Sequence, residues 1–280
     1  MSGKIETGWG SREFAESWKK QAETRNRMMA AATERMFTEA RVVSGARVLD
    51  LGTGTGDTAL FAAERVGPSG SVTATDASPS MVEAAAAAVR AVGAKNVTVR
   101  AMDATQMDLP ASSFDAVIAR HVLMFLDIPR AVAEVRRVLR PGGRLAATVW
   151  GPLAQNPFHR IVIDAASRRA KAGWGESVPE VVRAFSVPDP EAWRRALVAA
   201  RFDLVVVESL PVERRFESAM EALESVRASP ILSGALGVLP EAERASAWME
   251  IESACRGFET TSPGAGGVAG LAGGAGGTGG

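Results

Sequence analysis

The sequence has few of the residues that build disulfides and metal sites. Its 280 residues include one cysteine, Cys255, and two histidines. A single cysteine excludes an internal disulfide and a metal site built from cysteines. No metal site is therefore predicted, and we interpret the chain as a protein of the reducing cytoplasm.

Excess charge and long apolar segments are also absent. Lys+Arg and Asp+Glu both number 32, so no overall field draws the protein to nucleic acid or to an anionic membrane. No apolar run approaches the ~20 residues of a membrane span. Residues 1–20 contain charges and no apolar core, so we expect no signal peptide. These absences favour a small-molecule partner, with no nucleic acid and no membrane span.

Segments of strand and helix length alternate through the middle of the chain. Strands are predicted near residues 46–51, 71–75, 96–101, 114–119 and 143–150, and helices near 56–66, 79–92 and 128–139. Such alternation is typical of parallel βαβ units with right-handed crossovers. The expected fold class is α/β, a Rossmann-like, doubly wound and mostly parallel sheet with a helical cap.

The flanking segments predict further units around this core, which spans residues 45–151. Residues 1–44 form an N-terminal helical segment, because apolar residues recur at helical spacing from Ser11 to about Val43. Residues 152–257 add a strand near 203–208 and several helices. Residues 258–280 are rich in glycine and alanine and are expected to be disordered, because they bury too little apolar surface to offset the entropy of ordering.

A glycine-rich loop follows the first predicted strand, and Asp76 ends the second. Gly52, Gly54 and Gly56 allow close approach of the backbone to a ligand. Residues 54–59 also match the dinucleotide pattern G-x-G-x-x-A, and Asp76 suits ribose hydroxyls. Asp50 argues against a dinucleotide, because a carboxylate at this strand end repels a pyrophosphate. It suits the ammonium and sulfonium of S-adenosylmethionine.

Five motifs together resemble the class I S-adenosylmethionine-dependent methyltransferases. Val48–Gly56 resembles motif I, and Thr73–Asp76 resembles the acidic end of the second strand. Residues 102–104 resemble the loop after the third strand, and residues 114–120 resemble the fourth strand. Residues 138–145 resemble the turn into the fifth strand. The closest similarity is to the small-molecule methyltransferases of ubiquinone and menaquinone biosynthesis. It covers roughly residues 10–210.

The resemblance implies roles for the matching positions and for the flanking segments. Residues 1–44 would form a lid, in which Trp18 covers the cofactor or packs in the core, and residues 152–257 would bind the acceptor. The family's sheet has seven strands, and its last strand would follow Phe258. No β-branched run occurs there, so that strand is expected to be weak, replaced or absent. The resemblance implies that the methionine end of the cofactor is held by Asp50, Gly52, Thr53, Gly54 and Gly56, and that the ribose is held by Asp76. The adenine ring would pack on Ala77 and Met81, and its edge would be bound by Asp103 and Ala104. Arg120 would lie near the methionine carboxylate or the methyl group.

Two histidines are candidates for the chemistry. Methyl transfer from a sulfonium is a direct displacement, so the enzyme mainly aligns the reactants, and a base helps where the acceptor is a hydroxyl or an ammonium. His121 follows the fourth strand at its carboxyl end, where ligands of open α/β sheets bind. His159, the weaker candidate, begins a helix after the fifth strand. Either histidine is alternatively a wall residue without a chemical role.

The predicted function is an S-adenosylmethionine-dependent methyltransferase that acts on oxygen, nitrogen or carbon of a small, partly apolar acceptor. The expected protein is cytoplasmic, and a monomer or a homodimer. An NAD-dependent oxidoreductase and a non-catalytic S-adenosylmethionine-binding module are the alternatives. The sequence does not identify the acceptor.

Overall fold

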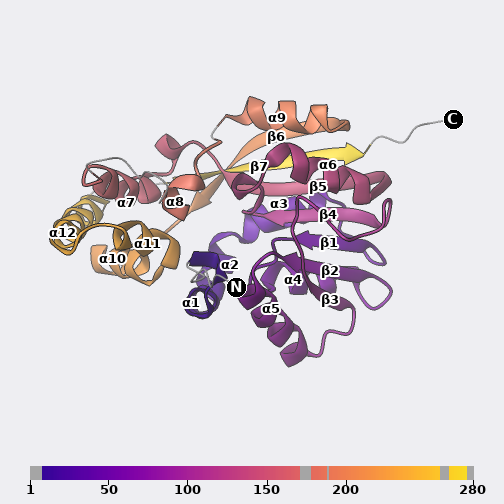
Figure 1. The fold of residues 1–280 in the computed structure, drawn as a ribbon, viewed down its shortest axis with the longest axis horizontal. Coiled ribbons are helices and arrows are strands. Elements are labelled where there is room, and N and C mark those ends of the chain that lie inside the picture. The colour runs from indigo at the N-terminus through magenta and orange to yellow at the C-terminus, as the bar shows by residue number, and fades with distance from the viewer. Residues whose placement is uncertain (1–7, 171–177, 188, 259–264, 276–280) are drawn as a thin grey trace, which may run out of the picture.

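The central element of the computed structural model is one sheet with the strand order β3-β2-β1-β4-β5-β7-β6 (Figure 1). The structure describes residues 8–170, 178–187, 189–258 and 265–275. Neighbouring strands from β3 to β5 are parallel, and β7 is antiparallel to both β5 and β6. The strands are β1 (Arg47–Leu51), β2 (Ser71–Asp76), β3 (Val97–Ala101), β4 (Phe114–Arg120), β5 (Leu139–Trp150), β6 (Phe202–Glu213) and β7 (Ala265–Ala275).

Helices cover both faces of this sheet and form a separate group beside it (Figure 1). The predicted Rossmann-like, doubly wound and mostly parallel α/β fold is confirmed. The helices are α1 (Arg12–Lys20), α2 (Ala22–Met28), α3 (Ala30–Glu39), α4 (Asp57–Val66), α5 (Pro79–Val92), α6 (Ile128–Val138), α7 (Pro157–Ser167), α8 (Glu180–Arg183), α9 (Pro190–Ala199), α10 (Ala219–Ala228), α11 (Pro230–Gly237) and α12 (Glu241–Phe258).

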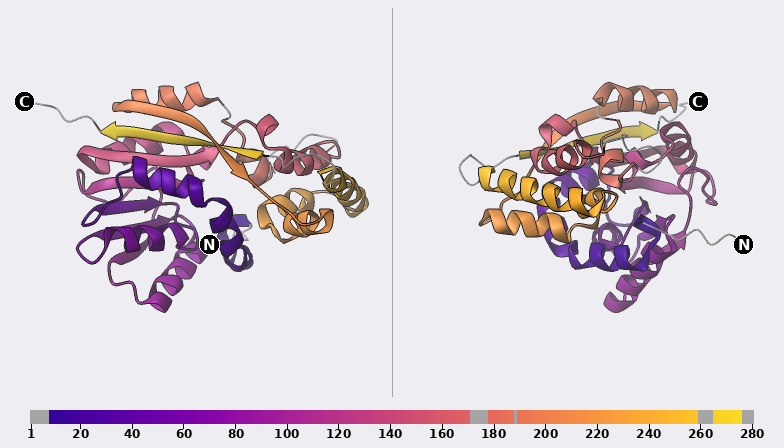
Figure 2. Two further views of the ribbon diagram at one scale, coloured as in Figure 1. Left: turned by 180° about the vertical axis from the view of Figure 1, so that it is seen from behind. Right: turned by 60° about the vertical axis from the view of Figure 1, so that its left-hand side comes forward.

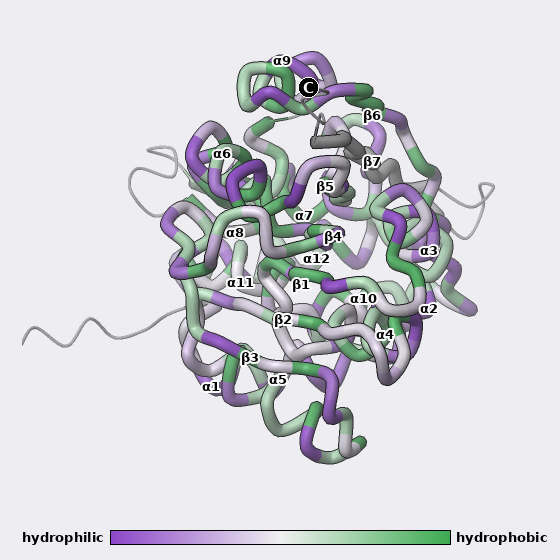
Figure 3. The backbone as a smooth tube through the Cα atoms, turned by 90° about the vertical axis from the view of Figure 1, so that its right-hand side faces the viewer, coloured by the Kyte–Doolittle hydropathy of each residue, from purple (hydrophilic) through white to green (hydrophobic). Residues whose placement is uncertain are grey.

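The central strands are apolar on both faces, which is typical of a parallel sheet buried between helices. On one face Leu49 and Val117 pack in a cluster with residues of α6 and α9. On the other face Val48 and Ile118 pack in a cluster with residues of α3 and α4. Figure 3 shows the apolar residues along β1 and β4. Both strands are therefore held rigidly, and their carboxyl ends provide a fixed edge.

The strand order reverses between β1 and β4, which pair in the middle of the sheet. In open α/β sheets ligands bind at the carboxyl ends of the strands beside such a reversal. β1 ends at Leu51 and β4 ends at Arg120. The glycine-rich loop and His121 therefore lie at the edge where a ligand is expected.

The C-terminal helices build a second apolar core away from the sheet. Residues of α7, α10, α11 and α12 pack together, with Leu223, Leu236 and Ile251 almost completely buried. Figure 1 places this group beside one end of the sheet. Helix α9 is different, because Trp193 and Leu197 pack in the cluster on the sheet. No helix in the described part of the chain has the length and apolar character of a membrane span.

The C-terminal segment differs from the expectation. Residues 258–280 are predicted to be disordered, yet residues 265–275 form β7, which pairs with β5 and β6 (Figure 2). Composition argues against this strand because glycine and alanine bury little apolar surface. A position between β5 and β6 instead offers backbone hydrogen bonds on both sides, which need no side chain. Residues 259–264 and 276–280 lie outside the described residues.

Candidate active site

The loop between β1 and α4 depends on backbone conformations that favour glycine. Gly52, Gly54 and Gly56 have φ angles of 66°, 56° and 90°. At Gly52 space is limiting as well, because an added Cβ would lie 2.4 Å from a methyl group of Val122. The loop therefore packs directly against the segment after β4, and the ends of the two central strands meet there.

Asp50 lies at the base of the loop and is 1% exposed. Thr53 Oγ1 donates a hydrogen bond of 2.7 Å to Asp50 Oδ2. Burial raises the pKa of Asp50 to about 7, while the bond from Thr53 and the charge of Arg120 oppose the rise. The carboxyl group is therefore poised between its two protonation states near neutral pH, and a bound cation would favour the ionised state.

Asp76, at the end of β2, is fixed by two backbone donors. Gly54 N–H donates to Asp76 Oδ2 and Ser78 N–H donates to Oδ1, both at 2.9 Å. Burial raises the pKa of Asp76, and these backbone bonds act in the opposite direction. A carboxylate oxygen accepts more than one hydrogen bond, so both oxygens retain capacity for ligand hydroxyls. Ala77 is exposed beside this site, and Met81 is buried in α5.

Asp103 lies in the loop after β3, at the same edge of the sheet. Its Oδ1 accepts hydrogen bonds of 2.7 Å from the backbone N–H and from the hydroxyl of Thr105. These bonds lower the pKa of Asp103, which is exposed, whereas Ala104 is buried. Asp103 stabilises its own turn in this way. The turn orients the carboxylate and leaves its Oδ2 without a hydrogen-bond donor among the described residues.

Two arginines converge on Asp57, the first residue of α4. Arg25 of α2 pairs with Asp57 at 2.7 Å, and Arg120 approaches the same carboxylate oxygen at 4.0 Å. Arg120 also donates to Asn26 Oδ1 at 2.9 Å, and burial lowers its pKa to about 10. Sequence reasoning identified Arg120 and missed Arg25. No spacing relative to the glycine loop marks Arg25, which reaches the site from a separate helix.

The two histidines flank one tryptophan. The ring of Trp150 lies 4.5 Å from that of His121 and 4.4 Å from that of His159. His121 has a φ of 58° and its Nε2 is buried without a hydrogen-bond partner among the described residues. Burial lowers the pKa of both histidines to about 3, and the charge of Arg120 adds to the effect at His121. Both imidazoles are therefore neutral at pH 7.

Comparisons with known proteins identify the family of the chain. The family described as "Methyltransferase domain" matches residues 48–143. Demethylmenaquinone methyltransferase of Thermus thermophilus is 36% identical over 170 residues, which cover 56% of this chain and 74% of that protein. The chain belongs to the S-adenosylmethionine-dependent methyltransferases.

A second curated relative and one solved structure are also similar to this methyltransferase. Nocamycin O-methyltransferase of Saccharothrix syringae is 36% identical over 168 residues, and the match spans 56% of this chain and 59% of that protein. The structure of Haemonchus contortus phosphoethanolamine N-methyltransferase 2 with S-adenosylmethionine has a TM-score of 0.53 at 19% identity. That match covers 84% of this chain and 49% of the other, and it shows the shared fold.

The N-terminal segment of the methyltransferase lies over the loop and over the end of β2. The hydroxyl of Ser78 donates to the carbonyl of Trp9 at 2.7 Å, and an added Cβ at Gly54 would lie 3.5 Å from Trp18 Nε1. The Trp9 ring lies 5.1 Å from Trp18 and 5.9 Å from Phe125. Met81 packs in the same cluster. Trp18 therefore contacts the loop and also belongs to an apolar cluster.

A small cavity of about 20 Å³ opens beyond Trp150. His159 is one of its walls and His121 is not, because Trp150 lies between the two. The cavity is lined by Met28, Trp150, Asn156, Pro157, Phe158, His159, Val212 and Arg214. Its volume corresponds to about one water molecule.

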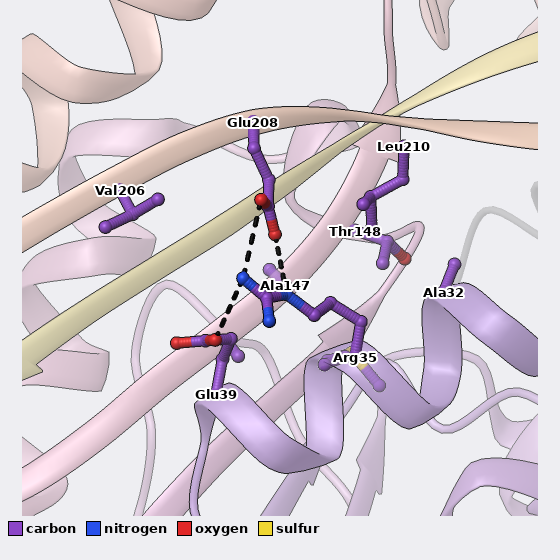
Figure 4. Close-up of a pocket in the computed structure, with 10 residues that line it drawn as sticks. Ala32, Arg35, Glu39, Ala147, Thr148, Val206, Glu208 and Leu210 are labelled. Atoms are coloured by element: carbon purple, nitrogen blue, oxygen red, sulfur yellow. Dashed lines mark hydrogen bonds and ion pairs between the residues drawn. The ribbon is translucent and has the colours of Figure 1, made fainter.

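A second hollow lies between α3 and the strands β5 and β6 (Figure 4). Arg35 crosses it and pairs with Glu208 at 2.8 Å and with Glu39 at 3.2 Å. The hollow measures about 10 Å³, close to the lower limit for one water. Its charges are paired with one another, so we interpret it as a contact between α3 and β6.

Proposed function

We propose that this protein transfers the methyl group of S-adenosylmethionine to oxygen, nitrogen or carbon of a small, partly apolar acceptor. The observation that carries the proposal is the arrangement at one sheet edge of the glycine loop, buried Asp50 and Asp76 with its two backbone donors. Family membership supports the same cofactor. No observation favours the dinucleotide or non-catalytic alternatives.

The residues at this edge fit the cofactor by charge and by hydrogen bonding. Asp76 has lone pairs left for two ribose hydroxyls, and ionised Asp50 attracts the ammonium of the methionine end. Arg25 and Arg120 are cations whose side chains are 14% and 10% exposed on the same side of the loop, so they suit the methionine carboxylate. Asp103 and Ala104 would bind the adenine edge, and Ala77 and Met81 would pack the adenine ring. When bound, S-adenosylmethionine supplies an electrophilic methyl group on a sulfonium.

The chain's own contribution to transfer is alignment and exclusion of water. Trp150 and Phe158 line the cavity next to the edge, and the N-terminal segment covers the loop. A neutral imidazole accepts a proton, but a pKa near 3 makes His121 and His159 weak bases. We therefore propose that they position the acceptor and accept a proton only from an acidic one. His159 lines the cavity and is the better placed of the two.

The cysteine content and the net charge bear on the compartment and the partner of the enzyme. The single cysteine, Cys255, is buried and free, which suits a reducing cytoplasm. Zero net charge supports a small-molecule acceptor in preference to nucleic acid. We propose a cytoplasmic monomer or homodimer.

Removing the carboxylate of Asp76 tests the cofactor assignment. Asp76→Ala is expected to weaken S-adenosylmethionine binding at least tenfold in calorimetry, because the ribose loses its acceptor. Asp108→Ala is the matched control, since its side chain in the same region is 99% exposed. Equal affinities of the two variants would contradict the assignment. Tight NADH binding without S-adenosylmethionine binding would instead favour the oxidoreductase.

A further inference from the structure

Arg25 connects the N-terminal segment to the first turn of α4. Its Nη2 donates to Asp57 Oδ2 at 2.7 Å, and its Nη1 donates to the backbone carbonyl of Trp18 at 2.8 Å. The guanidinium also lies 4.2 Å from the centre of the Trp18 ring. One side chain therefore bonds the backbone of Trp18, packs on its ring and pairs with the residue that begins α4.

Trp18 is the residue through which this connection reaches the glycine loop. An added Cβ at Gly54 would lie 3.5 Å from Trp18 Nε1. The Trp18 ring also lies 5.1 Å from the ring of Trp9 and 6.0 Å from that of Phe14. These two aromatic residues belong to the same N-terminal segment, so their contacts with Trp18 do not attach it to the loop. The bonds of Arg25 do.

The ion pair of Arg25 is shielded from water. The side chains of Arg25 and Asp57 are 14% and 19% exposed, whereas those of Arg27 and Glu23, which pair within α2, are 75% and 87% exposed. Attraction between charges is screened less where water is excluded, and an exposed pair contributes little. We therefore expect Arg25 to hold its position far more firmly than Arg27.

Both sides of the connection are fixed by neighbouring bonds. On the loop side, the hydroxyl of Thr55 donates to Asp57 Oδ2 at 3.1 Å. On the helix side, Arg120 at the end of β4 donates to Oδ1 of Asn26, the residue after Arg25, at 2.9 Å. A guanidinium bonds in a rigid planar fork, so a fixed carboxylate and a fixed helix determine where Arg25 holds Trp18.

We propose that Arg25 is a positioning residue, which holds Trp18 over the glycine loop and thereby slows the escape of bound S-adenosylmethionine. Arg25 fixes the carbonyl and the ring of Trp18, and the ring covers the loop at Gly54, where the methionine end would bind. This inference rests on the proposed function. An attraction of Arg25 for the methionine carboxylate is a separate role, and the experiment measures the two roles apart.

The rate at which S-adenosylmethionine dissociates tests the inference without an acceptor. The tritiated cofactor is bound, and its loss is followed after addition of excess unlabelled cofactor. Arg25→Gln is expected to release it roughly fivefold to tenfold faster than wild type, because Trp18 is no longer held over the loop. Arg25→Met repeats the test with a side chain that still packs on the Trp18 ring.

Arg27→Gln is the matched control. It removes the same charge from the same helix, at a side chain that is 75% exposed and pairs with Glu23 at 2.8 Å. Its dissociation rate is expected to equal that of wild type. Binding of the labelled cofactor at saturating concentration reports that each variant is folded.

Trp18→Ala separates positioning from direct contact with the ligand. If Arg25 acts through Trp18, then adding Arg25→Gln to Trp18→Ala changes the dissociation rate by less than about twofold, because the residue that Arg25 positions is already gone. If Arg25 instead acts by contacting the methionine carboxylate, the full effect of Arg25→Gln remains in the Trp18→Ala protein.

The outcomes separate this inference from the proposed function. A wild-type protein that does not bind S-adenosylmethionine contradicts the proposed function. Where the wild-type protein binds it, a wild-type dissociation rate in both Arg25 variants overturns the inference. Equal acceleration in Arg27→Gln overturns it as well, and so does an effect of Arg25→Gln that Trp18→Ala leaves undiminished.

Discussion

At the scale of single residues, the protonation state of Asp50 links cofactor binding to pH. Burial raises its pKa to about 7, so the group is mostly neutral below pH 7. A ligand with an ammonium and a sulfonium favours the ionised form and is therefore bound more weakly as the pH falls through 7. We expect affinity for S-adenosylmethionine to fall by up to about tenfold per pH unit between pH 7 and pH 6.

Calorimetry on wild type and on Asp50→Asn at pH 8, 7 and 6 measures this dependence. The asparagine variant cannot ionise, and the titration of the ligand's own groups is common to both proteins. The expected result is a steeper decrease for wild type. Parallel curves would show that Asp50 does not bind the cation.

Gly52 is the residue at which conformation and space are both limiting. Gly52 and Gly93 share a φ of 66°, but an added Cβ is 2.4 Å from Val122 at Gly52 and meets nothing within 4 Å at Gly93. Gly93→Ala is expected to lower the free energy of unfolding by roughly 1–2 kcal/mol, the cost of left-handed backbone. Gly52→Ala adds overpacking of about 1–3 kcal/mol. Urea unfolding compares the two, and equal losses would exclude the clash.

At the scale of elements, α1 connects the two parts of the molecule. It packs against α5 beside the sheet and against α11 of the helical group, and Ser17 and Gln21 donate to the carbonyl of Ala228. Because its Trp18 also contacts the loop at Gly54, we expect bound S-adenosylhomocysteine to slow amide hydrogen exchange in α1. Trp18→Ala is expected to remove most of this protection while leaving that of α12 unchanged. Protection confined to residues 50–57 would argue against a covering role.

Features that depend on neighbouring residues were predicted from the sequence, whereas contacts between residues far apart in the sequence were not. Asp50, the glycines and Asp76 follow from local patterns, since each stands at the end of a strand whose helix comes next in the chain. Arg25 meets Asp57 across 32 positions, and Arg214 meets Met28 across 186 positions. No periodicity or spacing reports such contacts. The positions of Asp50, the glycines and Asp76 at the sheet edge were therefore predictable, whereas the contacts of Arg25 and Arg214 were not.

At the scale of the whole molecule, β7 is the strand that joins β6 to the rest of the sheet. Among the described strands, β6 pairs with β7 alone, and β5 pairs with β7 on the side away from β4. Its composition does not predict a strand, because a strand is predicted from the side chains that it would bury. Here the strand is stabilised by backbone hydrogen bonds to the strands on both sides. Without β7, the backbone N–H and C=O groups of β5 and β6 that face it would have no partner. Unpaired groups of this kind cost free energy where they are buried, and they promote association between molecules where they are exposed.

A chain that ends at residue 264 is therefore expected to lose strand content in circular dichroism and to elute as aggregate in size-exclusion chromatography. A chain that ends at residue 275 is the matched control and is expected to behave as wild type. Gly270→Pro tests the backbone directly, because Gly270 pairs with Thr148 on one side and with Glu208 on the other. Proline donates no hydrogen bond, so a central strand tolerates it poorly. If both the 264-residue chain and Gly270→Pro unfold at the wild-type temperature, the sheet does not depend on β7.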